Sequence, residues 1–420
     1  MKNTILLLIG LGLLAGMAEA GEIGEVDIHG FLSQGYLKTD HNNYMAETED
    51  GSFQFNELGL NFGTRLSGKL WLGMQFFARD LGTDGNDELV LDWAVADYRW
   101  QDFLGVRVGK IKNNYGYYAA IRDVDLLRTS VFVPRSIYSE MFRDATSSFK
   151  GVSFYGEIEL GGFGSMAYDF VNGLPNMGPD TGLASGWENY WAFLELDVTN
   201  LKSGMSFTYD LKWETPLNGL MLGFTRMWFN DIEVDGTLSG NLAEKVYHIT
   251  GFHEKSDLAY IFLTIRYAWQ GFVLMGEFAQ NDMDRRIDMD GFEGGYLDAD
   301  SITTQGWYAG MAYRFNRYFE AEYKYSEYYG NRYNKDGKDV YDNKLLNQLL
   351  NINGTLKSRN DDFLAWTKTS TFSFRFDISE YWLFKFEIAY NDGFGELTSA
   401  QTDDLKRYWW LYAAKVTYNF

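Results

Sequence analysis

The C-terminal segment 407–420, RYWWLYAAKVTYNF, constrains the fold more than any other part of this sequence. Side chains alternate between the two faces of a β-strand. In an extended conformation one face would carry Tyr408, Trp410, Tyr412, Ala414, Val416, Tyr418 and Phe420, and the other would include Lys415, Thr417 and Asn419. Strands of membrane-spanning barrels meet lipid on one face and water on the other. The segment therefore predicts the last strand of a transmembrane β-barrel.

The N-terminus has the features of an export signal. Lys2 precedes an apolar stretch from Ile5 to Met17, and Ala18-Glu19-Ala20 forms a small-residue cleavage site. The stretch is too short to span a bilayer as a helix. We therefore predict a signal peptide at 1–20 and a mature barrel domain at 21–420. For such an exported chain the terminal Tyr418 and Phe420 resemble the signal that the outer-membrane insertion machinery reads.

Composition supports an all-β membrane protein. No later apolar run approaches the length of a spanning helix, and aromatic residues make up 18% of the chain. Barrels use such residues in girdles at the two membrane interfaces. Cysteine is absent, which excludes disulfides and thiolate metal sites, and the net charge of −21 argues against nucleic-acid binding.

Alternating segments joined by short and long connections in turn predict sixteen antiparallel strands, with both chain ends on the short-turn side. Two further segments, Trp191–Val198 and Lys245–His253, would raise the count to eighteen. A soluble sandwich is the other all-β alternative, and no repeat of fixed period indicates a solenoid or propeller. The predicted strands are Val26–Lys38, Phe53–Thr64, Lys69–Arg79, Leu89–Arg99, Leu104–Lys112, Phe149–Glu159, Gly162–Val171, Ser206–Trp213, Gly219–Phe229, Leu258–Trp269, Phe272–Asn281, Thr304–Phe315, Phe319–Tyr328, Leu364–Asp377, Tyr381–Asn391 and Arg407–Phe420.

Segment 113–148, after the fifth predicted strand, does not alternate. It is too long for a hairpin turn and too apolar for a solvated loop. Its apolar residues need a dry surface, and its charged residues need water or partners. We therefore predict that it folds back into the barrel as a constriction loop. The apolar set is Ile121, Val124, Leu126, Leu127, Val131, Phe132, Val133 and Ile137, and the charged set is Arg122, Asp123, Asp125, Arg128, Arg135, Glu140, Arg143 and Asp144.

This region resembles the third loop of Gram-negative porins related to the phosphate-selective porins. The likeness is carried by Val106–Lys110, Gly116–Tyr118, Ile121–Val124 and Pro134–Tyr138. It implies a water-filled channel for passive diffusion of small hydrophilic solutes and ions, narrowed by this loop, in a homotrimer of the outer membrane. The sequence shows no dense ladder of basic residues, so the likeness does not extend to phosphate selection.

We expect the constriction to hold basic and acidic side chains facing one another, which filters solutes by size and charge. The alternative for each residue is a local salt bridge that pins the loop to the wall. Arg107 should point inward, because it alternates with Val106 and Val108. The predicted constriction residues are Arg107, Lys110, Arg122, Asp123, Asp125, Arg128 and Arg135.

No catalytic, metal or cofactor site is predicted. The acidic stretches 80–88 and 336–342 do not match the spacing of a calcium loop, so we interpret them as solvated loop tips. None of the four histidines stands in a nucleophile motif. Two alternatives to a general porin stay open: a substrate-specific channel with an aromatic track, and a hydrolase built into the barrel.

Overall fold

The computed structural model describes residues 25–82, 84–85, 87–191, 194–240, 248–291, 297–338, 362–395 and 405–420. The predicted signal peptide lies outside these residues. Within them, no helix is long and apolar enough to cross a bilayer. The strands are β1 (Asp27–Thr39), β2 (Asn56–Arg65), β3 (Leu70–Leu81), β4 (Asp84–Gly85), β5 (Val90–Gln101), β6 (Leu104–Lys112), β7 (Ser148–Glu159), β8 (Ser165–Pro175), β9 (Leu196–Lys202), β10 (Ser206–Glu214), β11 (Leu220–Leu238), β12 (Gly251–Trp269), β13 (Phe272–Asp290), β14 (Leu297–Asn316), β15 (Phe319–Tyr329), β16 (Trp366–Asp377), β17 (Trp382–Gly393) and β18 (Tyr408–Asn419). The helical elements are the α-helices α2 (Arg143–Ser147) and α3 (Gly182–Tyr190) and the 3₁₀ turns η1 (Ala119–Ile121), η2 (Asp125–Leu127), η3 (Gly161–Phe163) and η7 (Asp362–Ala365).

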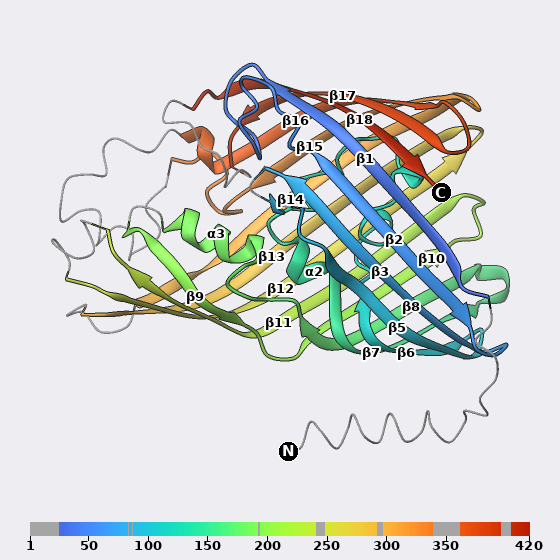
Figure 1. The fold of residues 1–420 in the computed structure, drawn as a ribbon, viewed down its shortest axis with the longest axis horizontal. Coiled ribbons are helices and arrows are strands. Elements are labelled where there is room, and N and C mark those ends of the chain that lie inside the picture. The colour runs from blue at the N-terminus through green and yellow to red at the C-terminus, as the bar shows by residue number, and fades with distance from the viewer. Residues whose placement is uncertain are drawn as a thin grey trace.

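Sixteen of the strands form a closed antiparallel barrel in which each pairs with its neighbours along the chain (Figure 1). β1 closes the ring by pairing with both β2 and β18. At the end of this seam the Gly30 amide donates to the Phe420 carbonyl at 2.9 Å, and the Phe420 amide donates to the Gly30 carbonyl at 3.0 Å. The predicted count of sixteen is confirmed. The role of Tyr418 and Phe420 as an assembly signal stays a prediction.

The two remaining strands do not add to the number of strands around the barrel. β4 is a two-residue strand paired with β3. β9 continues β10: both pair with β11, which places Lys202 opposite Glu233 and Phe207 opposite Trp228. Residues 196–198 of the proposed extra strand Trp191–Val198 are therefore the start of β9, and 251–253 of the other candidate is the start of β12. The eighteen-strand alternative is wrong because these segments lengthen existing strands.

The connections alternate in length as predicted, with seven short turns at one end of the barrel and eight longer connections at the other. The short-turn end also holds the start of β1 and the C-terminus (Figure 1). In barrels of this kind the short turns face the periplasm, so we call this the periplasmic end.

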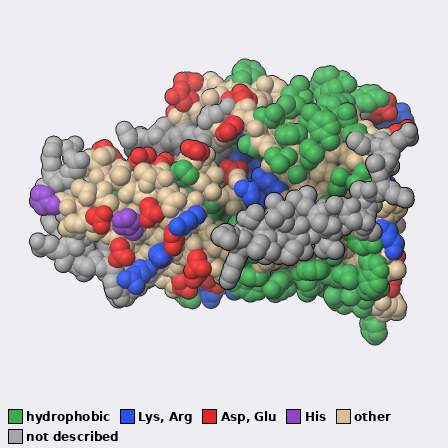
Figure 2. Space-filling view, turned by 60° about the horizontal axis from the view of Figure 1, so that its bottom comes forward, with side chains coloured by type: hydrophobic (Ala, Val, Ile, Leu, Met, Phe, Trp, Pro, Cys, Tyr) green, Lys and Arg blue, Asp and Glu red, His purple; other side chains and the backbone are tan. Residues whose placement is uncertain are grey.

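The outer surface carries an apolar band (Figure 2). On β12, Leu263 and Ile265 are 48% and 51% exposed, whereas Phe262 and Thr264, which alternate with them, are buried. β18 alternates in the same way: Tyr408, Trp410, Tyr412 and Val416 are exposed, and Trp409, Leu411, Ala413, Lys415 and Thr417 are buried. The face predicted to meet lipid is thus outside, as a transmembrane barrel requires.

Several strands run beyond the predicted limits. β11 extends to Leu238 and β13 to Asp290, while β12 begins at Gly251 and β14 at Leu297. In these extensions the outer face is polar, with residues such as Glu233 and Lys255. Hydrophobic alternation marks only the part of a strand that meets lipid, so sequence periodicity missed the rest.

Candidate channel constriction

Segment 113–148, called the inserted loop from here on, lies inside the barrel. Its hydrogen bonds reach strands all round the wall. The Gly116 amide donates to Thr225 Oγ1 on β11 at 3.1 Å, Ser136 Oγ donates to the Trp307 carbonyl on β14 at 3.2 Å, and the Val131 amide donates to Glu387 Oε2 on β17 at 2.8 Å. Only a segment that crosses the interior reaches all of these strands.

Glu277 on β13 anchors the first part of the inserted loop. The hydroxyls of Tyr138 and Tyr308 donate to its Oε2 at 2.7 and 2.8 Å, and the Tyr117 amide and Thr264 Oγ1 donate to its Oε1 at 2.7 and 2.8 Å. All four donors are uncharged, so the buried carboxylate is stabilised entirely by hydrogen bonds.

Two glycines let the backbone fit this anchor. Gly116 has a φ of +56°, and a Cβ there would lie 2.3 Å from the Tyr138 hydroxyl. At Gly306 on β14 a Cβ would lie 1.8 Å from the Ser136 carbonyl oxygen. A side chain at either position would push the inserted loop away from the wall.

The apolar side of the inserted loop packs against the wall, with two exceptions. Val131, Phe132 and Val133 are buried, and Phe132 stacks on Phe55 with ring centroids 5.2 Å apart. Leu126 and Leu127 are instead 38% and 56% exposed. The prediction that they need a dry surface is wrong, because they form the tip of the loop and face the water of the lumen.

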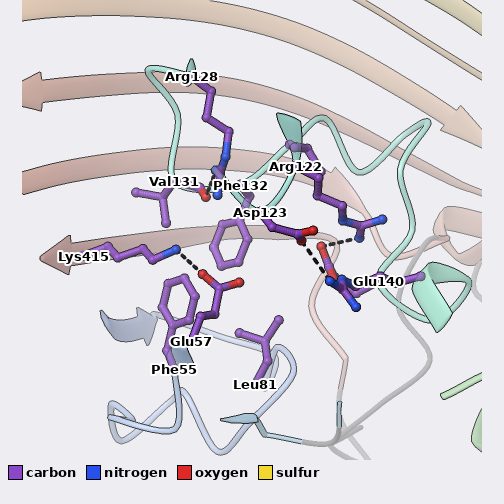
Figure 3. A pocket seen from close by; sticks show the side chains of 12 residues that line it. Phe55, Glu57, Leu81, Arg122, Asp123, Arg128, Val131, Phe132, Glu140 and Lys415 are labelled. Atoms are coloured by element: carbon purple, nitrogen blue, oxygen red, sulfur yellow. Dashed lines mark hydrogen bonds and ion pairs between the residues drawn. The ribbon is translucent and has the colours of Figure 1, made fainter. Parts of the chain in front are cut away.

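Charged residues hold the inserted loop to β3, β5 and β6 through a cluster of ion pairs. The Asp123 carboxylate lies 2.9 Å from Arg143 and 3.0 Å from Lys112. Glu140 lies 2.5 Å from Arg122 (Figure 3). It also lies 2.7 Å from Arg79 on β3. The members of this cluster are Arg79, Asp92, Lys112, Arg122, Asp123, Glu140 and Arg143.

A second group holds the tip of the loop near the periplasmic ends of β17 and β18. Asp125 Oδ1 lies 2.7 Å from Arg128 and 3.3 Å from Lys385. Asp125 Oδ2 lies 2.8 Å from Lys415 and accepts a hydrogen bond from Thr417 Oγ1 at 2.6 Å. We call Arg128, Lys385, Lys415 and Thr417 the Asp125 cradle. Lys415 also pairs with Glu57 on β2 (Figure 3).

Between the two groups lies a cavity of about 20 Å³, a volume that holds about one water molecule. Its polar lining includes Glu57, Arg122, Asp123, Glu140 and Lys415, and its apolar lining includes Phe55, Leu81 and Phe132 (Figure 3). The inserted loop is therefore packed tightly against this side of the barrel.

These ion pairs shift the pKa values of the loop carboxyls. Burial alone would raise the pKa of Asp123, but Arg143 and Lys112 outweigh it and lower the pKa. At Asp125 burial also acts to raise the pKa. Lys385, Lys415 and Arg128 outweigh it, so the pKa lies well below its usual value. At Glu140, Arg122 and Arg79 overcome burial and lower the pKa to about 2.

We therefore expect single-channel conductance to stay constant as pH falls from about 7 to about 4. A carboxyl with a depressed pKa stabilises its folded arrangement above its ordinary pKa, which is 4.5 for Glu140, and loses that contribution as pH falls toward 2. Planar-bilayer recordings across this range test the prediction. A step in conductance near pH 4.5 would show that these carboxyls are not held in ion pairs.

The structure brings together four of the seven predicted constriction residues: Arg122, Asp123, Asp125 and Arg128. They make the ion pairs that the alternative interpretation proposed. Arg135 also lies in the loop, where it donates to Asn391 Oδ1 at 3.2 Å and stacks over Tyr44.

The other two predicted residues lie on β6 rather than in the inserted loop, although Asn114 of the loop donates to the same Asp169 oxygen as Arg107. Arg107 points inward as expected and pairs with Asp97 at 3.1 Å and Asp169 at 2.9 Å. Lys110 is paired across the sheet with Lys150, on the same face as the exposed Val108. Its assignment to the constriction is wrong, because it faces outward and donates to the Leu91 carbonyl at 2.6 Å.

Sequence reasoning did not assign the wall residues that hold the loop: Glu57, Arg79, Glu277, Lys385 and Lys415. Each of them lies at a position of its strand that faces the barrel interior, and this alternation was the only sign of them in the sequence. No dense basic ladder was expected, yet Arg375, Lys385 and Lys415 are direct cross-strand neighbours on β16, β17 and β18. In the described part of the chain, no group of three or more His, Asp or Glu side chains is arranged to hold a metal ion. Two acids of the 336–342 stretch, Asp339 and Asp342, lie outside the described residues.

No protein-family model and no curated protein matches the sequence. Solved structures match its fold. OprB of Pseudomonas putida has a TM-score of 0.55 at 11% identity, with 94% of each chain covered. OmpT, an outer membrane protein of Vibrio cholerae, has a TM-score of 0.53 at 10% identity, covering 95% of this chain and 100% of that one. An anion-selective porin from Comamonas acidovorans has a TM-score of 0.52 at 13% identity, covering 94% and 99%.

At these identities the likeness concerns the fold. The closed barrel with its outer apolar band, together with these neighbours, indicates an outer-membrane protein of a Gram-negative bacterium.

Proposed function

We propose that this chain is a porin: a water-filled channel through which small hydrophilic solutes and ions diffuse passively across the outer membrane. The observation that carries the proposal is the inserted loop, which crosses the lumen of a 16-stranded barrel and is anchored on its wall. A barrel of this size encloses an aqueous channel. A loop held across it narrows the path without needing a bound cofactor.

Charges on opposite sides of the lumen support selection by charge. Lys385 and Lys415 are direct neighbours on β17 and β18. Asp169 and Asp210 are direct neighbours on β8 and β10, halfway round the ring. Both pairs lie about four residues from the periplasmic ends of their strands. We propose that the resulting field orients dipolar solutes as they pass.

Replacing Arg122 and Arg128 with Ala should shift the selectivity of the channel toward cations, because the negative charges of Glu140 and Asp125 are then less fully neutralised. We expect the cation-to-anion permeability ratio to rise about two- to fivefold at low salt, where screening is weak. The reversal potential in a KCl gradient across a planar bilayer measures this. The control is Lys255→Ala with Arg286→Ala, which removes two positive charges from the outer wall, beside Glu233 and Asp288. An unchanged reversal potential in the double variant would contradict the role proposed for these arginines.

We propose that the protein acts as a channel and not as an enzyme. A screen of purified protein against peptide, ester and glycoside substrates separates the two. Turnover of any of them, lost on replacing a lumen residue, would favour the barrel-embedded hydrolase instead.

We also propose that the protein is a homotrimer. Ala94 and Ala96 give β5 a small-residue outer face on which a second barrel packs closely. Gly105 on β6 does not add to this outer face, because it lies inside against the Tyr155 ring. We expect mass measurement in mild detergent to give three chains per particle, and a monomeric mass would contradict the proposal.

A further inference from the structure

We propose that the Asp125 cradle is a binding site for the carboxylate group of a solute, and that Asp125 occupies it when no solute is bound. The inference rests on the proposed channel function and names a solute class for it. The structure already shows the cradle holding a carboxylate, supplied by the chain itself.

The geometry of the cradle matches a planar carboxylate. One oxygen of Asp125 lies 2.7 Å from Arg128 and 3.3 Å from Lys385, and the other lies 2.8 Å from Lys415 and 2.6 Å from Thr417 Oγ1. Two donors therefore serve each oxygen, and three of the four belong to basic side chains. Charge-assisted hydrogen bonds of this kind are the strong ones.

More basic side chains than carboxyl groups meet at the cradle. Arg128, Lys385 and Lys415 are the three basic groups, and Asp125 and Glu57 are the two carboxyl groups. Lys385 and Lys415 are directly opposed across β17 and β18, an arrangement that is unfavourable unless an anion lies between them. Wall and loop together thus favour an anion at this point, whatever molecule carries it.

The turn Asp125–Leu127 that delivers the carboxylate has few attachments outside the cradle, whereas Thr129 and Ser130 after it are held by Glu320 and Lys385. Its neighbours Leu126 and Leu127 are exposed to the lumen. The Leu126 carbonyl accepts one hydrogen bond, from Arg375 at 2.7 Å. The buried anchors of the loop, at Glu277 and Val131–Val133, lie on either side of the tip in sequence. A competing carboxylate therefore has to displace only this short turn, which lies near the periplasmic ends of the strands.

A chemical-rescue experiment tests the site in detergent micelles, independently of any channel activity. Asp125→Ala empties the cradle of its carboxylate and should lower the melting temperature. Sodium acetate should then restore about half or more of the loss, relative to sodium chloride at equal ionic strength, because a ligand that binds only the folded state stabilises it. Asp144→Ala, which removes an acid from the same loop outside the cradle, should show no response to acetate.

Further arms separate the possible outcomes. Adding Lys385→Met and Lys415→Met to Asp125→Ala should abolish the acetate effect. Inorganic phosphate, tested at the same ionic strength, should rescue less than acetate. Rescue by neither anion, or equal rescue by phosphate, would overturn the carboxylate site.

Asp125→Asn provides a second test if the Ala variant does not fold, because it preserves the shape of the side chain. In planar bilayers it should raise the permeability of succinate relative to potassium, and Asp144→Asn should not. No difference between the two variants would overturn the proposal. A wild type that forms no channels at all would instead contradict the proposed function, while the micelle experiment would still report on the site.

Discussion

Deleting residues 126–133 will increase single-channel conductance, by about threefold if the lumen opens to the width expected for a 16-stranded barrel. The deletion removes the exposed tip, the Arg128–Asp125 pair, and the packing of Val131 and Phe132 on the wall. What remains of the inserted loop lacks the turn and the wall contacts that hold it across this side of the lumen. Planar-bilayer recordings in KCl give the conductance directly.

Two controls make the result interpretable. Replacing Leu126 and Leu127 with Ser changes the exposed tip but leaves the anchors, so we expect little change in conductance. The absence of native cysteine also allows single cysteines to report position. A charged thiol reagent should reduce the current of Leu127→Cys and leave Val131→Cys unaffected, since Val131 is 1% exposed. Equal conductance in wild type and deletion variant would show that the loop does not narrow the channel.

Replacing Glu277 with Ala will release the first part of the inserted loop and make the channel current noisy. The substitution removes four hydrogen bonds to a buried carboxylate and leaves the Tyr117 amide and the hydroxyls of Tyr138 and Tyr308 without their acceptor. Hydrogen bonds to charged groups contribute about 1.5–3 kcal/mol each, so we expect a local cost of about 4 kcal/mol once the groups have partly rearranged. The barrel wall should stay folded, because the lost contacts belong to the loop.

Hydrogen exchange of the amides at 116–118 and single-channel noise analysis measure the effect. Glu327→Ala is the matched control. Glu327 also accepts hydrogen bonds from Tyr325, Tyr329 and Trp307, but none of these three residues belongs to the inserted loop. If Glu277→Ala and Glu327→Ala give the same exchange and the same noise, Glu277 does not anchor the loop.

Most of the barrel wall could be predicted, because contact with lipid requires an alternation of apolar and polar residues that is visible in the sequence. Every barrel strand was found, and the ends were misplaced mainly where β11 to β14 leave the membrane band. Lys110 was misassigned although its own parity, shared with Val106 and Val108, places it outside. The exposure of Leu126 and Leu127 was missed because an apolar residue carries no sign of which part of a loop will be the tip.

The amino-acid sequence by itself determined the sixteen-stranded barrel, which face of each strand meets lipid, and that segment 113–148 needs a place inside. These features follow from local patterns, the period-2 alternation of strands and the mixture of apolar and charged residues in one long connection. Only the tertiary structure decided which charges meet. Asp125 finds Lys385 and Lys415, and Val131 finds Glu387, across more than 250 positions of sequence. Such partners become neighbours only when the ring closes and the loop crosses it, because a buried charge takes whichever counter-charge the closed barrel places beside it.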